Sequence, residues 1–403
     1  MGLIQKPGRR LLFEPPKSRG LPDTIYGQDR TKTLLGIAVA IIGFGVIGYV
    51  LLHQSSAATP LVVAEAENGS VAGKASLRTA DSGASGSQSV LFGTPGGSQT
   101  GIKLGAAIEP DYLDNAKYAN TLINYKFDSL TAENAMKFAP IEPNRNQFNW
   151  SGADKIVNFA VAHNMRVRGH TLVWHTEVPG WVNGLSATDA AAALQNHIKT
   201  VMQHYKGKVT QWDVVNEAID DSGGGLRDTI WKQKLGNDYI AQAFKWAREA
   251  DPTAQLCYND YGMESAATMS DGNNLAPKAD AVLAMVKDFK SRGVPIDCVG
   301  FQTHSYGDYP GKEADIQANI KRLGDAGVKV EITELDATGG DAARYAEIGR
   351  ACKNSGYCTG VTTWGLDDPT SFRSEDNPLL FDGNFNPKPA YSALLDAIGH
   401  PKP

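Results

Sequence analysis

Short apolar runs alternate with amphipathic stretches along the chain from residue 101 onward. The apolar runs lie at residues 102–108, 127–130, 165–173, 209–215, 254–258, 296–301, 328–332 and 360–364. Helical periodicity covers stretches between them, such as 191–205, 239–249, 279–290 and 315–323. Eight strands that alternate with helices predict an α/β fold of the (β/α)8 TIM barrel type. A doubly wound open sheet is the alternative, but no Gly-x-Gly-x-x-Gly follows the first strand.

The residues that end the predicted strands are polar or aromatic. From the second strand to the eighth they are Glu133, Asn134, Lys137, His170, Trp174, His175, Asn216, Glu217, Asn259, Asp260, Tyr261, Gln302, His304, Glu334, Asp336 and Trp364. A barrel of this type carries its function at the carboxyl ends of its strands. Carboxylates and amides bind sugar hydroxyls, and aromatic faces pack on sugar C–H faces. The mixture at this rim therefore predicts a carbohydrate site.

Two of these strands end in a glutamate, Glu217 and Glu334. A lone glutamate at a strand end is usually only solvated. Two on one rim form the carboxylate pair that cleaves a glycosidic bond, one as acid/base and the other as nucleophile. We expect His304, Asp336 and Glu334 to form a hydrogen-bonded chain that keeps Glu334 charged. Asn216 is expected to donate to the sugar 2-hydroxyl.

Seven motifs resemble glycoside hydrolase family 10, the retaining endo-β-1,4-xylanases. They lie at 131–137, 169–175, 212–217, 258–261, 300–304, 331–336 and 363–365, in order within residues 101–399. The resemblance implies that Glu217 is the acid/base and Glu334 the nucleophile. It also implies residues on the glycone side of the cleft: Glu133, Asn134, Lys137, His170, Trp174, Gln302 and Trp364. Tyr261 is expected on the aglycone side.

The chain departs from the family pattern in two loops. Ser371, Phe372 and Arg373 stand where members usually carry a second tryptophan after the one of the eighth strand. This predicts a smaller aromatic platform over the reacting sugar. The loop after Asp336 is short and Gly-rich at 337–340, which predicts a more open aglycone side.

Two other functions stay open at this point. One is a non-catalytic polysaccharide-binding protein of the cell surface, built on an inactivated barrel. The retention of His304 and Asp336 argues against it, since a binder needs neither. The other is the same chemistry on β-1,4-glucan, because the sequence does not decide between xylan and glucan. A monomer is expected.

The N-terminal hundred residues predict a membrane anchor and a linker. Residues 34–52 form an uncharged apolar run long enough to span a bilayer. Basic side chains outnumber acidic ones in the tail 1–33, which places this tail in the cytoplasm and the barrel outside. Cleavage of a signal peptide at the small residues 55–58 is the alternative, and would give a secreted protein. Residues 53–100 predict a linker, with short pieces that resemble the opening of a carbohydrate-binding module.

Charge and cysteine spacing narrow the function further. The net charge is −5 and the sequence of the main body holds no basic cluster, which argues against a nucleic-acid partner. No Cys-x-x-Cys or Cys/His ligand spacing occurs, so the sequence predicts neither a metal nor a cofactor. Cys352 and Cys358 flank a turn and are the expected disulfide, as in many family 10 relatives. Cys257 and Cys298 lie in apolar strands and are expected to be buried free thiols.

Other aromatic residues are expected to be structural. His163, His197 and His204 are predicted at the surface, and Trp181, Trp231 and Trp246 in the core. His175 and Asp260 are either support for the site or structural residues.

Overall fold

The computed structural model describes residues 75–79, 88–92, 101–221 and 224–403. The chain divides into two compact units, Met1–Leu91 and Phe92–Pro403. Strands β1 (Ala75–Thr79) and β2 (Gln88–Phe92) pair with each other in a small sheet. The predicted anchor at 34–52, and most of the predicted linker, lie outside the described residues. None of the helices in the described ranges is long and apolar enough to cross a bilayer.

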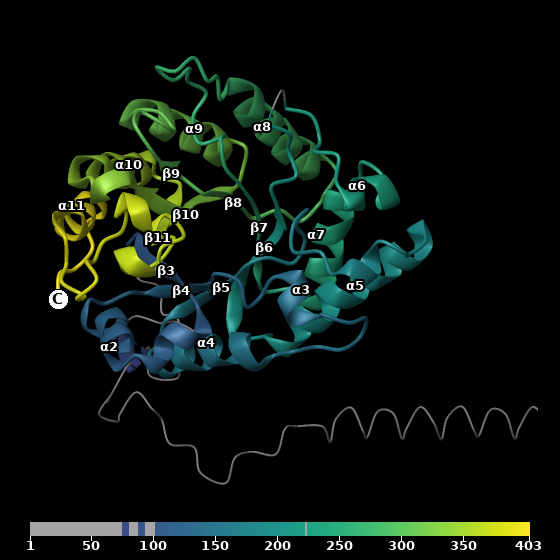
Figure 1. Cartoon of the computed structure of the whole chain (residues 1–403), viewed down its shortest axis with the longest axis horizontal. Helices are drawn as coiled ribbons and strands as arrows, with labels where there is room; N and C mark the ends of the chain where they lie inside the picture. The colour runs from purple at the N-terminus through teal and green to yellow at the C-terminus, as the bar shows by residue number, and fades with distance from the viewer. Residues whose placement is uncertain (1–74, 80–87, 93–100, 222–223) are drawn as a thin grey trace, which may run out of the picture. The chain divides into compact units, whose positions relative to one another are not determined.

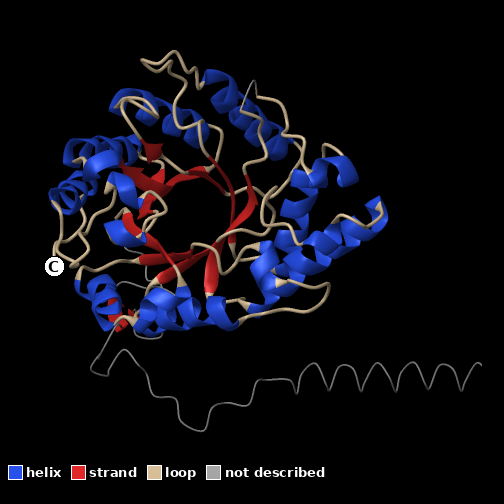
Figure 2. Ribbon diagram, in the orientation of Figure 1, coloured by secondary structure: helices blue, strands red, loops and turns tan. Residues whose placement is uncertain are grey.

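The predicted barrel is confirmed in the described part of the second unit. Its eight parallel strands are β3 (Lys103–Ile108), β4 (Ser129–Ala132), β5 (Arg166–Gly169), β6 (Val209–Asn216), β7 (Gln255–Asp260), β8 (Cys298–Phe301), β10 (Lys329–Ala337) and β11 (Cys358–Thr363). The sheet closes because β11 pairs with β3, with Gly360 opposite Lys103. A short strand, β9 (His304–Ser305), adds to β10. Figure 2 shows the strands as a ring with the helices outside it.

The helices follow the strands in the alternation that the sequence predicts (Figure 1). They are α2 (Ala116–Asn124), α3 (Phe138–Ile141), α4 (Ser151–Ala162), α5 (Ala187–His204), α6 (Ile230–Leu235), α7 (Tyr239–Ala250), α8 (Ala276–Ser291), α9 (Glu313–Asp325), α10 (Ala342–Ser355) and α11 (Pro389–Ile398). Short 3-10 turns lie at η2 (Pro110–Asp114), η3 (Gly180–Val182), η4 (Thr338–Gly340), η5 (Asp368–Thr370) and η6 (Ser374–Asp376).

Helix α5 shows how these helices form and pack. The Ser186 side chain accepts a hydrogen bond from the Asp189 backbone N–H at 3.1 Å and so caps the first turn. Leu194, Ile198 and Val201 recur at helical spacing and are fully buried against the barrel. His197 lies on the same face, with Nδ1 2.9 Å from Glu142 Oε2. The prediction of a surface His197 was therefore wrong, because the inward face of α5 includes it; His163 and His204 are exposed.

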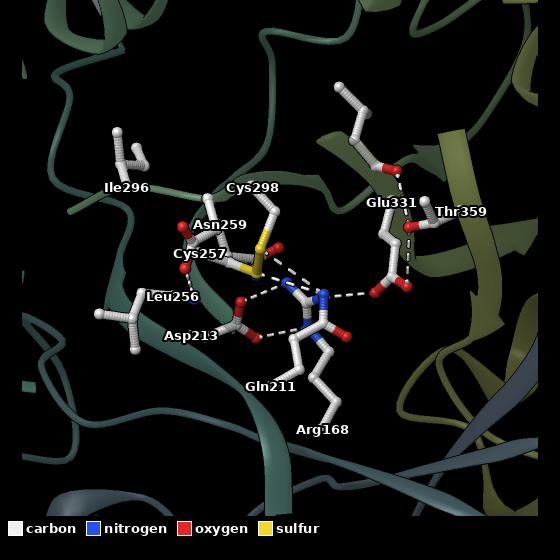
Figure 3. The surroundings of a disulfide bond; sticks show 12 residues. Arg168, Gln211, Asp213, Leu256, Cys257, Asn259, Ile296, Cys298, Glu331 and Thr359 are labelled. Carbon is white, nitrogen blue, oxygen red and sulfur yellow. Dashed lines mark hydrogen bonds and ion pairs between the residues drawn. A yellow bond between two sulfur atoms is a disulfide. The ribbon is translucent and has the colours of Figure 1, made fainter. Parts of the chain in front are cut away.

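The interior of the barrel holds a buried ionic chain. Arg168 is 1 % exposed; its Nε lies 3.0 Å from Asp213 Oδ2 and its Nη1 2.5 Å from Glu331 Oε2. Arg166 Nη2 lies 2.7 Å from the other oxygen of Glu331. Each buried charge thus has an opposite partner, without which it would be strongly destabilising. Figure 3 shows the carboxylates of Asp213 and Glu331 on either side of the Arg168 guanidinium.

A disulfide joins Cys257 on β7 to Cys298 on β8, beside the ionic chain (Figure 3). The prediction of free thiols at these positions was wrong, although both are buried as expected. Strand register explains the pairing: Cys257 and Cys298 are opposite each other on adjacent parallel strands, with their Cα atoms 4.4 Å apart. A single sequence does not reveal that register. The predicted Cys352–Cys358 disulfide is confirmed, and it links the end of α10 to the start of β11.

The tryptophans predicted in the core mostly lie there. Trp231 and Trp246 are buried, while Trp181 is half-buried and packs against the core. Trp231 also donates a hydrogen bond from Nε1 to the Trp174 carbonyl oxygen at 2.8 Å. This contact fixes the backbone of a residue expected to line the cleft.

Candidate active site

Glu217 directly follows β6 and lies among neutral donors. Trp174 Nε1 donates to its Oε2 at 2.8 Å, and Gln302 Nε2 donates to its Oε1 at 2.9 Å. The backbone of Glu217 has a φ of 54° and its N–H donates to the Asn259 carbonyl at 2.9 Å. A non-glycine residue in this left-handed region carries a conformational cost.

Glu334 lies within β10 and is 4 % exposed. Asn259 Nδ2 donates to its Oε1 at 2.7 Å, and His304 Nε2 lies 3.3 Å from its Oε2. Thr333 Oγ1 donates to Asn259 Oδ1 at 2.7 Å, so that the Asn259 amide presents its N–H toward Glu334. The two oxygens of Glu334 therefore face one neutral donor and one imidazole.

Gln302 connects the surroundings of the two glutamates. Its side chain donates to Glu217, and its carbonyl oxygen accepts from the Glu334 backbone N–H at 3.0 Å. The structure thus brings together two carboxylates that lie more than a hundred positions apart in the sequence. Asn216, predicted beside them, is buried, and its side-chain amide lies 2.9 Å from Asn259 Nδ2.

His304 lies between Glu334 and Asp336. Its Nδ1 is 2.7 Å from Asp336 Oδ2, on neighbouring positions of β9 and β10. Burial alone would lower the pKa of His304, but hydrogen bonds to Asp336 and Glu334 and the charges of both carboxylates raise it to about 10. The imidazole therefore carries a proton and a positive charge at neutral pH. The predicted chain from Asp336 through His304 to Glu334 is present.

Arg373 completes the support of Asp336. Its guanidinium pairs with Asp336, donates to Thr338 Oγ1 at 2.8 Å and reaches Asp376 Oδ2 at 2.7 Å. These contacts attach the short loop after Asp336 to the loop after β11. The neighbouring Phe372 is 60 % exposed, with its ring centroid 5.3 Å from that of His304. An aromatic ring thus stands beside the site at the position where the sequence predicts a smaller platform.

Three of the residues predicted for the glycone side, Glu133, Asn134 and Lys137, lie just after β4. Lys137 Nζ donates to Asn134 Oδ1 at 2.6 Å and lies 4.8 Å from the centre of the Trp174 ring. Asn134 also donates to Glu109. Burial and the nearby carboxylate of Glu109 raise the pKa of Glu133 to about 7, although Lys137 acts in the opposite direction.

His170 and Trp364 lie at the ends of β5 and β11 and contact each other. Their ring centroids are 5.2 Å apart in an edge-to-face arrangement, and both side chains are largely buried. His170 Nδ1 is 3.0 Å from Asp213 Oδ2, so the imidazole is tied to the ionic chain of the barrel interior. This contact orients the ring and leaves Nε2 for another partner.

Tyr261 belongs to a separate network on the β7 side. Its hydroxyl donates to Asp221 Oδ2 at 2.9 Å, and Lys278 Nζ lies 3.9 Å from its ring centre. Lys278 Nζ is 2.9 Å from Asp260 Oδ1 as well. Arg227 reaches from this network to the Glu217 carbonyl oxygen at 3.1 Å. Asp260 is therefore a buried supporting residue, and His175 lies at the site's edge, 3.9 Å from Glu217 Oε2.

The sequence analysis missed four residues that the structure places at the site. Asn259 was recognised as a strand end without a role, and Asp213, Arg373 and Glu109 were not selected. Asp213 lies four residues before Glu217 on a strand, so alternation predicts that its side chain faces the interior. No local pattern marks Arg373 or Glu109, because their partners Asp336 and Asn134 come from distant segments. Among the described residues no group of His, Cys, Asp or Glu side chains is arranged to hold a metal ion.

Comparisons with known proteins agree with this geometry. The family model of glycosyl hydrolase family 10 matches residues 97–397. Endo-1,4-beta-xylanase 3 of Hypocrea jecorina is 38% identical over 299 residues, which cover 74% of this chain and 82% of that protein. Endo-1,4-beta-xylanase B of Thermotoga neapolitana is 39% identical over 305 residues, with 71% and 85% covered.

A solved structure shows the same relationship. Xylanase 10B from Thermotoga petrophila, solved in complex with xylobiose, superposes with a TM-score of 0.68 at 34% identity. The match covers 77% of this chain and 98% of that one. The family model, the curated relatives and the shared barrel together show that the chain belongs to glycosyl hydrolase family 10.

Proposed function

We propose that this endo-1,4-β-xylanase of family 10 cleaves internal xylosidic bonds with retention, using Glu334 as nucleophile and Glu217 as acid/base. The observation that carries the assignment is the contrast between the two carboxylates. Glu334 lies beside His304, which is protonated at neutral pH, whereas Glu217 accepts from the neutral donors Trp174 and Gln302. The His304 cation stabilises the negative charge that a nucleophilic carboxylate must carry, and the donors to Glu217 bring no charge to the group that must transfer a proton in each step.

In the first step a Glu334 oxygen forms a bond to the anomeric carbon while the glycosidic bond breaks. Glu217 gives its proton to the departing oxygen, so that the leaving sugar departs as a neutral alcohol. In the second step Glu217 takes a proton from water, and the water oxygen bonds to the anomeric carbon. The ester to Glu334 breaks, and both carboxyl groups return to their starting state.

The remaining residues of the predicted site are proposed to hold the substrate. Glu133, Asn134, Lys137, His170, Trp174, Gln302 and Trp364 would bind the glycone side, and Tyr261 the aglycone side. Hydrogen-bonding groups and large aromatic faces together suit xylose rings. The xylobiose complex of the Thermotoga petrophila relative supports a xylo-oligosaccharide as the ligand.

Two variants test the assignment. Glu334→Gln should lose several orders of magnitude of activity on xylan while its circular dichroism spectrum stays unchanged, because no covalent intermediate can form. Glu217→Ala should retain activity on an aryl xylobioside with an acidic phenol, since that leaving group needs no protonation. Azide should then replace activated water and yield a β-glycosyl azide. Glu334→Gln activity within about tenfold of wild type would contradict the assignment.

A comparison of two substrates tests whether the enzyme prefers xylan or β-1,4-glucan. We propose xylan over β-1,4-glucan, on the similarity to proteins named as endo-1,4-beta-xylanases. Rates on aryl xylobioside and aryl cellobioside, measured with one enzyme preparation, report the tolerance of the extra hydroxymethyl group. Equal kcat/KM values for the two substrates would contradict the preference. Reducing-sugar release from xylan separates the enzyme from a non-catalytic binder.

The location of the enzyme is proposed from the sequence alone. Residues 34–52 would span the membrane, with the tail 1–33 in the cytoplasm, the linker 53–100 outside and the catalytic barrel 101–399 extracellular as a monomer. Protease treatment of intact cells, followed by mass spectrometry, tests this arrangement. Barrel peptides that stay protected until lysis would contradict it. A secreted protein that starts near residue 58 would show that the apolar run is a cleaved signal.

A further inference from the structure

A cavity of about 850 Å3 opens at the end of the barrel opposite to Glu217 and Glu334. Its walls come from the first residues of the strands: Lys103 on β3, Arg166 on β5 and Thr359 on β11 all line it. The catalytic residues instead lie at the last residues of the strands. The cavity is therefore a separate feature from the candidate active site.

The lining of this cavity is cationic. Lys103, Arg166, Lys208 and Lys353 contribute to it, and its lining includes no aspartate or glutamate. Arg166 is neutralised by Glu331, at 2.7 Å. Within the described ranges, the other three ammonium groups have no carboxylate within 4.0 Å, and those of Lys208 and Lys353 are exposed. This concentration of positive charge stands against a net charge of −5 for the chain.

The ammonium group of Lys353 lies beside Gly399, another residue of the cavity lining. A Cβ atom placed on Gly399 would lie 2.6 Å from Lys353 Nζ, and both residues line the cavity. Lys353 lies in the last turn of α10, whereas Lys208 lies in the exposed turn between α5 and β6. The fold thus gathers basic residues from distant segments, which explains why the sequence of the main body contains no basic cluster.

The rest of the lining suits a sugar. Asn164, Thr210, Thr253 and Gln255 are exposed and offer amide and hydroxyl groups for hydrogen bonds. Ile102 and the exposed Val161 supply apolar surface for C–H faces. The volume lies in the range of about 300–1,000 Å3 that is typical of organic ligand sites, and a single inorganic anion would fill only part of it.

We propose that this cavity is a second, non-catalytic binding site for an acidic saccharide, namely a uronate substituent on a xylan chain. The carboxylate pairs with the lysine ammonium groups, and the sugar hydroxyls bind the amide and hydroxyl side chains. Binding there holds an acidic xylan on the enzyme while another part of the polymer occupies the cleft. The identity of the ligand rests on the proposed xylanase function, whereas the anion site itself does not. A concave site favours a saccharide group over a flat membrane surface.

The test uses the full chain with Lys208→Glu/Lys353→Glu. The matched control is Lys117→Glu/Lys245→Glu, which reverses two exposed lysines outside the cavity and changes the net charge equally. Melting temperatures of both variants are compared with wild type. If the first variant does not fold, Lys208→Gln/Lys353→Gln takes its place.

Binding is measured by calorimetric titration in a Glu334→Gln background. Xylotriose carrying one glucuronate should show two classes of site, and neutral xylotriose only one. The cavity variant should weaken the second class at least tenfold, and the control should not. Three results would overturn the proposal: no second class of site, a second class that survives in the cavity variant, or a second class that neutral xylotriose also fills. If inorganic phosphate binds the second class of site as tightly as the acidic xylotriose does, the saccharide assignment is overturned. Binding only to vesicles with anionic lipid would overturn it as well.

Kinetic measurements with the active enzyme distinguish a failure of the second binding site from a failure of the xylanase assignment. The cavity variant should keep wild-type kcat and KM on an aryl xylobioside and show a raised KM on glucuronoxylan alone. An unchanged KM on glucuronoxylan would overturn the second site and leave the xylanase assignment intact. Inactivity of the wild-type protein on both substrates would instead overturn the function, and the calorimetric titration would still judge the anion site.

Discussion

His304 Nε2 lies 3.3 Å from Glu334 Oε2, and this contact places a protonated imidazole beside the proposed nucleophile. Asp336 holds the other ring nitrogen at 2.7 Å, so the two carboxylates share one cation. The arrangement stabilises the folded state as well as the charge distribution of the site. Its contribution must depend on pH, because an imidazole in the unfolded chain titrates at about 6.5.

We predict that the stability lost in His304→Gln depends on pH in a defined window. The folded-state pKa of about 10 lies above the unfolded value, so the folded protein binds more protons between them. The contribution of His304 is therefore complete below about pH 6.5 and declines as the pH rises toward 10. Urea denaturation of wild type and variant at pH 6 and pH 9.5 measures the difference. A gap in the free energy of unfolding that is equal at both pH values would contradict the prediction.

Glu133 is predicted to lose stability with rising pH as well, but in a lower pH window. Burial and Glu109 raise the pKa of this carboxyl to about 7, so the folded state again holds the proton above the ordinary range. Stability then decreases as the pH rises from about 4.5 to 7, because the ionised form is disfavoured in the folded site. The free energy of unfolding of Glu133→Gln, taken relative to wild type, should be higher at pH 8 than at pH 5. Glu109→Gln is the control. It removes one of the charges that raise the pKa of Glu133, so it should narrow the pH range over which Glu133 destabilises the folded state.

The two disulfides are predicted to differ in their effect on stability. Cys257–Cys298 encloses a sequence separation of 41, and Cys352–Cys358 one of 6. In the chain-entropy model these loops correspond to about 4 and about 2 kcal/mol. Replacing the first pair by alanine should therefore lower the melting temperature more than replacing the second. Both variants should keep the pH profile of xylan hydrolysis. An equal or reversed order of melting temperatures would show that loop closure is not the controlling factor.

The barrel could be predicted from the sequence because the patterns that indicate its strands and helices are local. Each strand is a short apolar run, each helix has its own period, and the strand ends of a barrel necessarily share one rim. Glu217, Glu334 and His304 were found by that reasoning together with the family resemblance. The hydrogen-bonded chain to Asp336 followed from their placement.

The features that the sequence did not predict depend on register and on distant segments. Cys257 and Cys298 pair because β7 and β8 align at those residues, and nothing near either cysteine encodes this alignment. Arg373 reaches Asp336 across 37 positions, and Glu109 reaches Asn134 across 25. His197 is different, because it lies at helical spacing with Leu194, Ile198 and Val201, so the period of α5 already indicates that it faces inward. For the two cysteines, Arg373 and Glu109, the deciding contact is tertiary and leaves no local pattern.

The buried pair of Arg168 and Asp213 provides the last prediction. Asp213 accepts from Arg168 and also lies 3.0 Å from His170 Nδ1, so one carboxylate serves the barrel interior and the cleft. Burial would raise the pKa of Asp213, but Arg168 and His170 outweigh it and hold the pKa below its usual range. Asp213→Asn leaves Arg168 with only Glu331 and should cost about 3–5 kcal/mol of stability.

A double-mutant cycle checks this coupling. Asp213→Asn combined with Arg168→Met removes both charges, and Arg166 still pairs with Glu331. The double variant should therefore lose less free energy of unfolding than the two single variants added together. Xylan hydrolysis should stay low in both variants that lack Asp213, because His170 loses the partner that fixes its ring. Additive losses of stability would show that Arg168 and Asp213 act independently. Wild-type rates of xylan hydrolysis in either variant would show that Asp213 does not orient His170.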